Sequence, residues 1–292
     1  PPGDGSGAVI PVECEIARDD NFRQIVGRVT QLGTAAGDFT IKIDARGLEP
    51  GTTYYYRFSA LGEASPVGRT RTLPRHTERV RLAAASCANL PAGFFNVYRA
   101  IAARPDLDAV LHLGDYIYEY RNGTYGDGTA FGRVPRPDKE ITTLEDYRTR
   151  HAQYKTDPDL QAAHAAHPWI TVWDDHEFAN NAWRGGALNH NPERGEGTWE
   201  DRRDAIIRSY YEWMPIREDR AARQTRIYRT FSFGELADLV MLDTRYVGRD
   251  REAGSVERMA TVEDPARSVL GRAQETWLFG ELVGWKRAGL AW

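Results

Sequence analysis

The fold is decided by the stretch DAVLHLGDYIYE at residues 108–119, in which an apolar run gives way abruptly to polar groups. Residues 108–113 have the length and the apolar content of a buried β-strand. The Gly114-Asp115 pair that follows is typical of a tight turn at a strand end, because glycine and aspartate both favour turns. Taken alone, Asp115 is therefore explained by a turn as readily as by a function.

Two other stretches repeat this pattern of a short strand that ends in reactive side chains. An apolar strand at residues 80–85 precedes the sequence SCAN at 86–89, and a strand at 169–173 precedes DDHE at 174–177. Four consecutive polar and ionisable groups after an apolar strand are costly to bury unless they are paired or bound to a metal. Cys87 by itself has the alternative explanation of a small core residue.

Helical patterns lie between these strands, and the alternation predicts an α/β layered domain. Ligands of open α/β sheets bind outside the carboxyl ends of the strands, so we expect the three polar clusters to converge there. Cysteine, aspartate, tyrosine and histidine are ligands that transition metals accept. The predicted helices are residues 96–104, 144–154, 159–166, 198–211 and 272–287, and a hairpin is predicted from 227–233 and 236–242.

The first 75 residues have a different pattern, which predicts a small β domain. Strands are expected at residues 9–16 and 39–44, and LEPGTTYYYRF at 48–58 resembles the tyrosine corner of fibronectin type III sandwiches. Tyr54 holds the position of the tyrosine whose hydroxyl bonds back to nearby backbone. About four strands are visible where such a sandwich needs about seven. We therefore expect a partial β-sandwich domain at 1–75 and a second domain at 76–292.

The composition excludes several classes of protein. The chain has 292 residues, 41% hydrophobic and 27% charged, which is ordinary for a globular protein with a sizeable core. A net charge of −4 gives no indication of a nucleic-acid-binding surface. No apolar run is long enough for a transmembrane helix. The two cysteines, Cys14 and Cys87, are too few for a disulfide scaffold, although a single bridge between them is an alternative.

The motifs together resemble one family. The Ser-Cys pair at 86–87, the sequence GDYIYE at 114–119 and the sequence WDDHEFANN at 173–181 resemble the PhoD-type alkaline phosphatases of the calcineurin-like metallophosphoesterase superfamily. The resemblance covers about residues 8 to 292. It implies an incomplete α/β layered metallophosphoesterase sandwich at 76–292, the N-terminal half of that domain, preceded by the fibronectin-like β-sandwich domain.

The resemblance also implies a set of metal ligands. Cys87 would be a thiolate ligand of iron, and Tyr118 a phenolate ligand of the same ion. Asp115 would bridge two metals, and Asp175 would bind the second. The implied cofactors are Fe³⁺ and Ca²⁺, which is consistent with soft and phenolate donors for ferric iron and hard oxygen donors for calcium.

His176 is the catalytic residue that the resemblance implies, a proton donor to the leaving oxygen. Glu177 is expected to orient His176 from behind, or else to be a surface acid at a helix start. Asp243 and Arg245 close a later strand, where they either face the cleft or form a structural salt bridge. Further expected contacts to metal or phosphate are Asp174, Asn180, Asn181 and Arg245, with Asp243 in the supporting layer.

The expected function is hydrolysis of small phosphate monoesters, of the alkaline phosphatase type, by water that a bound metal activates. One alternative is a phosphodiesterase or a phospholipase D-like hydrolase, and another is an inactive fragment that acts only as a binding module. The family implies a secreted or periplasmic protein, whose leader would be absent from this chain. Residues 289–292 resemble the start of a strand, and further family ligands are missing, so we expect this chain alone to be inactive or very weakly active.

Overall fold

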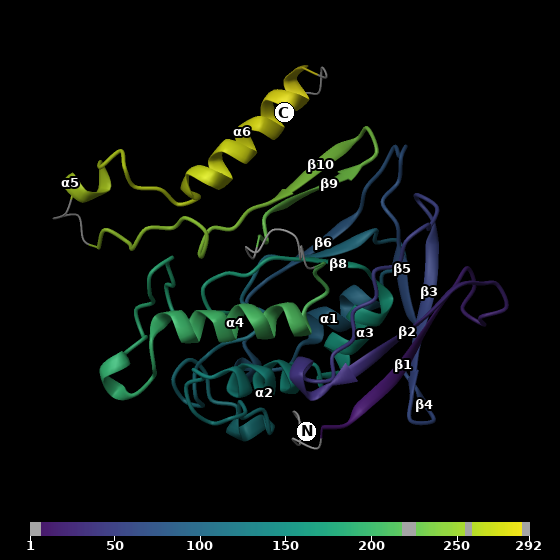
Figure 1. The fold of residues 1–292 in the computed structure, drawn as a ribbon, viewed down its shortest axis with the longest axis horizontal. Helices are drawn as coiled ribbons and strands as arrows, with labels where there is room; N and C mark the ends of the chain where they lie inside the picture. The colour runs from purple at the N-terminus through teal and green to yellow at the C-terminus, as the bar shows by residue number, and fades with distance from the viewer. Residues whose placement is uncertain (1–6, 218–225, 255–258, 288–292) are drawn as a thin grey trace.

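The computed structural model describes residues 7–217, 226–254 and 259–287 (Figure 1). The strand start expected at 289–292 lies outside these ranges. The first part of the chain forms one antiparallel sheet in the order β2-β1-β3-β4, with β5 also paired to β3. Its strands are β1 (Val9–Ala17), β2 (Ile25–Thr34), β3 (Thr53–Ala60), β4 (Glu63–Ala64) and β5 (Gly68–Arg71).

The tyrosine corner is confirmed, but the second predicted strand is wrong. The hydroxyl of Tyr54 accepts a hydrogen bond from the backbone N–H of Glu49 at 2.9 Å. Residues 40–46 form no strand, because the chain turns sharply just before them: Asp38 and Phe39 both adopt left-handed backbone angles. Ile43 packs against the small core of this sheet instead. The described strands thus form a single sheet, and they do not establish the two-sheet sandwich that we expected.

The second part of the chain is an α/β unit built on three parallel strands in the order β6-β7-β8. Val110 at the centre of β7 is fully buried. The helices α1 and α3 pack against each other, as do α2 and α4. The elements are β6 (Leu82–Ala85), α1 (Asn96–Ala102), β7 (Ala109–His112), α2 (Leu144–Tyr154), α3 (Pro158–Ala166), β8 (Trp169–Thr171) and α4 (Trp199–Trp213), with short 3-10 turns at Ala35–Gly37, Leu90–Ala92, Thr129–Phe131 and Pro192–Arg194.

Local capping explains where these helices begin. Thr143 and Asp146 form a reciprocal capping box at the start of α2. Asp157 accepts two backbone N–H groups at the start of α3, where Pro158 occupies the first helical position. Thr198 caps α4 in the same way. The predicted helices and strands of this part are therefore confirmed, with ends shifted by no more than two residues.

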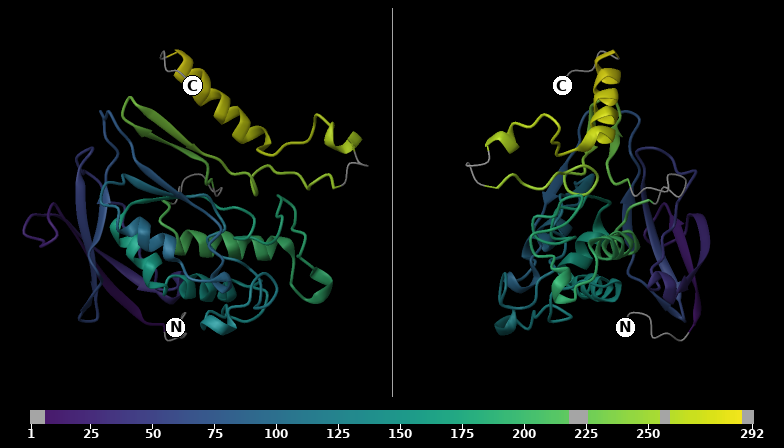
Figure 2. Two further views of the ribbon diagram at one scale, coloured as in Figure 1. Left: turned by 180° about the vertical axis from the view of Figure 1, so that it is seen from behind. Right: turned by 60° about the vertical axis from the view of Figure 1, so that its left-hand side comes forward.

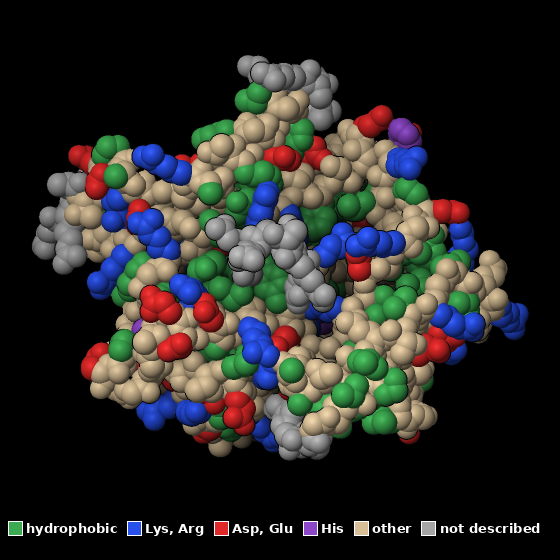
Figure 3. All heavy atoms as spheres, in the orientation of Figure 1, with side chains coloured by type: hydrophobic (Ala, Val, Ile, Leu, Met, Phe, Trp, Pro, Cys, Tyr) green, Lys and Arg blue, Asp and Glu red, His purple; other side chains and the backbone are tan. Residues whose placement is uncertain are grey.

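The predicted hairpin and final helix are also confirmed. They form an arm on the opposite side of the sheet from α2 and α4 (Figures 1 and 2). On the face drawn in Figure 3, hydrophobic side chains gather at the centre, and acidic and basic side chains alternate around them. None of the described helices is both long and apolar enough to cross a membrane. The arm consists of β9 (Arg229–Phe233), β10 (Ala237–Met241), α5 (Met259–Val262) and α6 (Gly271–Arg287).

Two buried histidines make the fold sensitive to acid. His112 and His151 are almost completely inaccessible to solvent. Burial, with a smaller contribution from the positive charge of Lys155, lowers the pKa of each to about 3. Their pKa in the unfolded chain is about 6.5. Between pH 6.5 and pH 3 the two histidines are protonated in the unfolded chain and neutral in the folded chain. The free energy of unfolding therefore falls as the pH decreases from 6.5 towards 3.

We therefore expect each histidine to cost up to about 2 kcal/mol of stability at pH 5 relative to pH 7. Urea denaturation of the wild type and of the double variant His112→Phe/His151→Phe at both pH values measures this cost. The loss between pH 7 and pH 5 should be smaller in the double variant. Replacing the exposed His76 with glutamine serves as the control, and an equal loss in all three proteins would contradict the prediction.

Candidate metal centre

The ends of β7 and β8 approach each other so closely that only glycine fits at position 114. A Cβ atom on Gly114 would lie 2.3 Å from the backbone nitrogen of Asp174, and its φ of +105° is unfavourable for other residues. Residues 86–89, which follow β6, also lie beside the end of β7. The N–H of Cys87 donates to the carbonyl of Gly114, and the N–H of Ala88 donates to the carbonyl of Asp115. The three strand ends thus converge, as the sequence predicted.

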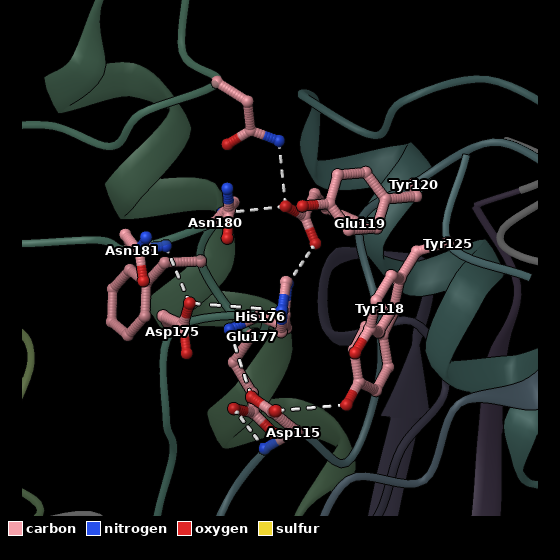
Figure 4. A network of polar contacts seen from close by, with 12 residues as sticks. Asp115, Tyr118, Glu119, Tyr120, Tyr125, Asp175, His176, Glu177, Asn180 and Asn181 are labelled. Atoms are coloured by element: carbon pink, nitrogen blue, oxygen red, sulfur yellow. Dashed lines mark hydrogen bonds and ion pairs between the residues drawn. The ribbon is translucent and has the colours of Figure 1, made fainter.

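Asp115 lies at the centre of the convergence and is almost completely buried. Its Oδ2 atom is 3.5 Å from Sγ of Cys87 and accepts a hydrogen bond from the hydroxyl of Tyr118 at 3.1 Å. The Cys87 thiol and the Tyr118 phenol therefore both lie against the same carboxylate oxygen of Asp115, and Figure 4 shows the contact with Tyr118. These are donors that suit a ferric ion.

The opposite side of Asp115 carries a second group of donors. Its Oδ1 atom accepts the backbone N–H of His176 at 3.3 Å. One ligand atom from each of Asp115, Asp175 and His176 lies within 4.8 Å of the others, which is close enough to hold one cation. Asp115 therefore belongs to both groups of side chains.

Glu177 holds the backbone of the site together. The side chain is buried, and its two oxygens accept the backbone N–H groups of Asp115, Tyr116 and Asp174. It thereby ties the turn after β7 to the turn after β8. This arrangement replaces both of our expectations for Glu177, since it neither contacts the His176 ring nor lies on the surface.

Glu119 is the residue that orients His176. It is fully buried, and its Oε2 atom is 2.8 Å from Nδ1 of the imidazole. Its Oε1 atom accepts from the backbone N–H of Asn180 at 2.7 Å and from the side-chain amide of Asn189 at 2.8 Å. A carboxylate only accepts hydrogen bonds, so Nδ1 carries the proton and Nε2 faces Asp175, 4.0 Å away.

The charges around His176 favour its protonated form. Burial opposes the imidazolium, but the hydrogen bond to Glu119 and the charges of Glu119, Asp175 and Asp115 raise the pKa of His176 to about 9. In the metal-free chain the imidazole therefore carries a second proton on Nε2, the nitrogen that faces Asp175.

Arg245 lies against the same carboxylates. Its guanidinium pairs with Asp174 and, at 3.1 Å, with Asp175. Among the described residues, its buried Nη1 atom has no hydrogen-bond partner, so it is a spare donor at the edge of the site. Both alternatives for Arg245 are therefore met, since it forms salt bridges and faces the site.

Asp243 supports Arg245 rather than entering the cleft or forming a salt bridge. It is fully buried, and its carboxylate accepts the backbone N–H groups of Arg245, Tyr246 and Val247. Gln274 on α6 bonds to both the N–H and the carbonyl of Asp243. The turn that carries Arg245 is thereby anchored to α6.

Three residues of the site have backbone angles in the left-handed region. Cys87, Asp115 and Asn181 adopt φ values of 59°, 53° and 51°, which residues other than glycine rarely adopt. Such conformations cost about 1–3 kcal/mol each and cluster at active sites. The backbone N–H of Asn181 bonds to Asp175 at 2.6 Å. A metal or phosphate contact from the side chains of Asn180 and Asn181 stays a prediction.

The donor set fits a cation. Burial raises the pKa of Asp115, against the charge of His176, and Asp174 and Asp175 raise it further. Burial and the charge of Asp115 raise the pKa of Glu177 to about 8. Burial, Asp115 and Cys87 also raise the pKa of the Tyr118 hydroxyl. Negative charge is thus unfavourable here without a compensating cation, and metal binding would be coupled to proton release.

Cys14 and Cys87 are both free, so the alternative of a disulfide bridge between them is wrong.

The fold and the site define an α/β protein with a candidate metal centre at the ends of its parallel strands. The model of the PhoD-like phosphatase family matches residues 82–292, and that of the N-terminal domain of PhoD-like phosphatases matches residues 2–74. The chain belongs to the PhoD-like phosphatase family.

Two known proteins show the extent of the similarity. The chain is 40% identical over 282 residues to alkaline phosphatase D of Bacillus subtilis (strain 168), covering 94% of this chain and 47% of that protein. A solved structure of PhoD is similar with a TM-score of 0.84 and 39% identity, over 96% of this chain and 55% of that one. The chain therefore spans about half the length of the relatives that it matches.

Sequence reasoning missed two residues of the site, Glu119 and Asn189. Glu119 follows a run of aromatic and apolar residues, Tyr116 to Tyr118, that is buried. A carboxylate in such a run requires a buried partner, and that signal was available in the sequence. No pattern pointed to Asn189, which lies far along the chain.

Proposed function

We propose that this chain carries the metal-binding part of a phosphatase that hydrolyses phosphate monoesters. The observation that supports it most is the position of Asp115, whose carboxylate lies against Cys87 and Tyr118 and also within metal-binding reach of Asp175 and His176. The family relationship gives the reaction class, and alkaline phosphatase D is the name of one relative.

We further propose Fe³⁺ for the side with Cys87 and Tyr118, and Ca²⁺ for the side with Asp175. Thiolate and phenolate suit ferric iron, and carboxylate oxygens suit calcium. Asp115 would contact both. When bound, the two cations would offset the charge of the phosphate and activate water as the nucleophile.

The residues of the chain have separate tasks in this reaction. Asp175 and Asp115 would hold the cations that bind the phosphate. The spare Nη1 donor of Arg245 would bind a phosphate oxygen, because a guanidinium matches the geometry of phosphate. His176, held by Glu119, would donate a proton from Nε2 to the leaving oxygen.

The purified chain, loaded with iron and calcium, tests this function directly. We expect metal to bind and to give the visible absorption of ferric iron ligated by tyrosine or cysteine. We also expect 4-nitrophenyl phosphate to be hydrolysed faster than by the free metals. Faster hydrolysis of bis(4-nitrophenyl) phosphate would favour a phosphodiesterase instead. Metal binding without hydrolysis of either ester would contradict a catalytic function for this chain.

The domain division and the location are proposals of the same kind. We propose domains at 1–75 and 76–292, which contact each other through the ion pair of Arg71 with Asp108 and the hydrogen bond from Trp213 to Asp38.

We also propose that the protein is secreted or periplasmic, as its family resemblance implies. Cell fractionation of the natural source would test the location.

A further inference from the structure

Tyr125 is an exposed aromatic residue at a fixed position beside the metal centre. Its side chain is 60% exposed, yet its backbone is held firmly. The side-chain amide of Asn89 donates to the carbonyl of Tyr125, and the N–H of Gly123 closes the turn on the carbonyl of Gly126. A Cβ atom on Gly126 would already touch Ala92, so the loop rests directly on the turn after β6.

The Tyr125 ring extends a wall of aromatic rings that begins at His176. Tyr118 stacks on His176 with ring centres 4.4 Å apart, and Tyr125 lies nearly parallel to both, 5.8 Å from Tyr118 and 6.2 Å from His176. Tyr120 contacts Tyr125 and His176 from a tilted position. In Figure 4 the rings of Tyr118 and Tyr125 lie on the opposite side of His176 from Asp175.

We propose that Tyr125 and Tyr120 form a binding platform for the planar aromatic leaving group of an aryl phosphate. The inference rests on the proposed phosphatase function. A phosphate held near Asp115 and Asp175 places its leaving oxygen next to Nε2 of His176. The group attached to that oxygen would extend past the edge of the imidazole towards Tyr125, whose ring centre lies 6.2 Å from that of His176.

The chemistry of the platform favours a flat π-system over an aliphatic chain. Aromatic rings gain stacking or edge-to-face contacts beyond the burial of their surface. The exposure of Tyr125 leaves ring surface free for such a contact. The fixed loop means that little conformational freedom is lost when a ligand binds.

The experiment compares phenyl phosphate with butyl phosphate in the metal-loaded chain. Tyr125→Ala should lower kcat/KM for phenyl phosphate about threefold to tenfold, the contribution of one aromatic contact, and change butyl phosphate by less than about twofold. Tyr125→Phe should keep the preference. Phe94→Ala is the matched control, because Phe94 is also 60% exposed but pairs with Phe131 rather than with the site. Equal losses for both esters, or the same change in Phe94→Ala, would overturn the proposal.

Binding of two phosphonates, which are not hydrolysed, separates this proposal from the proposed function. Calorimetry should show tighter binding of phenylphosphonate than of methylphosphonate to the wild type, and Tyr125→Ala should remove the difference. If this holds while no ester is hydrolysed, the platform stands and the phosphatase function fails. If the two phosphonates bind equally to the wild type, the platform is wrong even where hydrolysis is observed.

Discussion

Replacing Asp115 with asparagine is expected to abolish metal binding and to lower phosphatase turnover by about a thousandfold or more. The carboxylate faces Cys87 and Tyr118 with one oxygen and the backbone of His176 with the other. An asparagine keeps the size of the side chain but removes the negative charge that both cations would share. No neighbouring carboxylate can replace it, because Asp175 and Glu177 are committed to other partners.

The metal-free variant should be at least as stable as the wild type. Asp115 is a buried carboxylate beside Asp174 and Asp175, and its raised pKa shows that its charge is unfavourable there. Removing that charge offsets the loss of its hydrogen bonds. Thermal denaturation of both proteins in a chelator would measure this, and elemental analysis would measure the bound metal.

Asp108→Asn provides the control at the other end of the same strand. Asp108 pairs with Arg71 and accepts the N–H of Arg81, far from the metal centre. This variant should lose stability but keep its metal and its turnover. Full metal content in Asp115→Asn would mean that Asp115 is only a turn residue, as its position after Gly114 allows.

The sequence was sufficient to predict which residues converge, because topology alone brings the ends of parallel strands together. Cys87, Asp115 and Asp175 each follow a strand of the three-stranded sheet, and the apolar strands were visible as short runs. Gly114 was visible too, although the reason for the glycine, the close approach of Asp174, arises only in the folded chain.

The sequence was not sufficient to predict which glutamate holds which group. Glu177 is adjacent to His176, and adjacency made it the natural partner in our prediction. In the folded chain it turns towards the backbone of the neighbouring strand end, and the fully buried Glu119 reaches the imidazole from the other cluster. Such pairings depend on side-chain directions, which the periodicity of a sequence does not specify. The strand predicted at 39–44 failed similarly, because its alternating pattern hid the turn at Asp38 and Phe39.

Replacing His176 with asparagine should lower kcat by about 10²–10⁴-fold for alkyl phosphates and by much less for 4-nitrophenyl phosphate. An alkoxide needs a proton as it leaves, whereas 4-nitrophenolate leaves readily without one. The geometry supports this role, because Glu119 occupies Nδ1 and only Nε2 is free to donate. Glu119→Gln should also lower kcat more for alkyl phosphates than for 4-nitrophenyl phosphate, but by a smaller factor. This variant weakens the contact that orients the imidazole and leaves the imidazole in place.

The same variants decide between two chemical roles for His176. The histidine lies close enough to Asp115 and Asp175 to be a metal ligand, and a ligand would not distinguish between leaving groups. If His176→Asn loses metal and slows both classes of ester equally, His176 binds the cation and does not donate the proton. If the metal content is kept and only the alkyl esters are slowed, the proton donor is identified. We expect the second result, because the contact between Nδ1 and Glu119 turns Nε2 towards Asp175, 4.0 Å away, where it can reach the leaving oxygen of a bound ester.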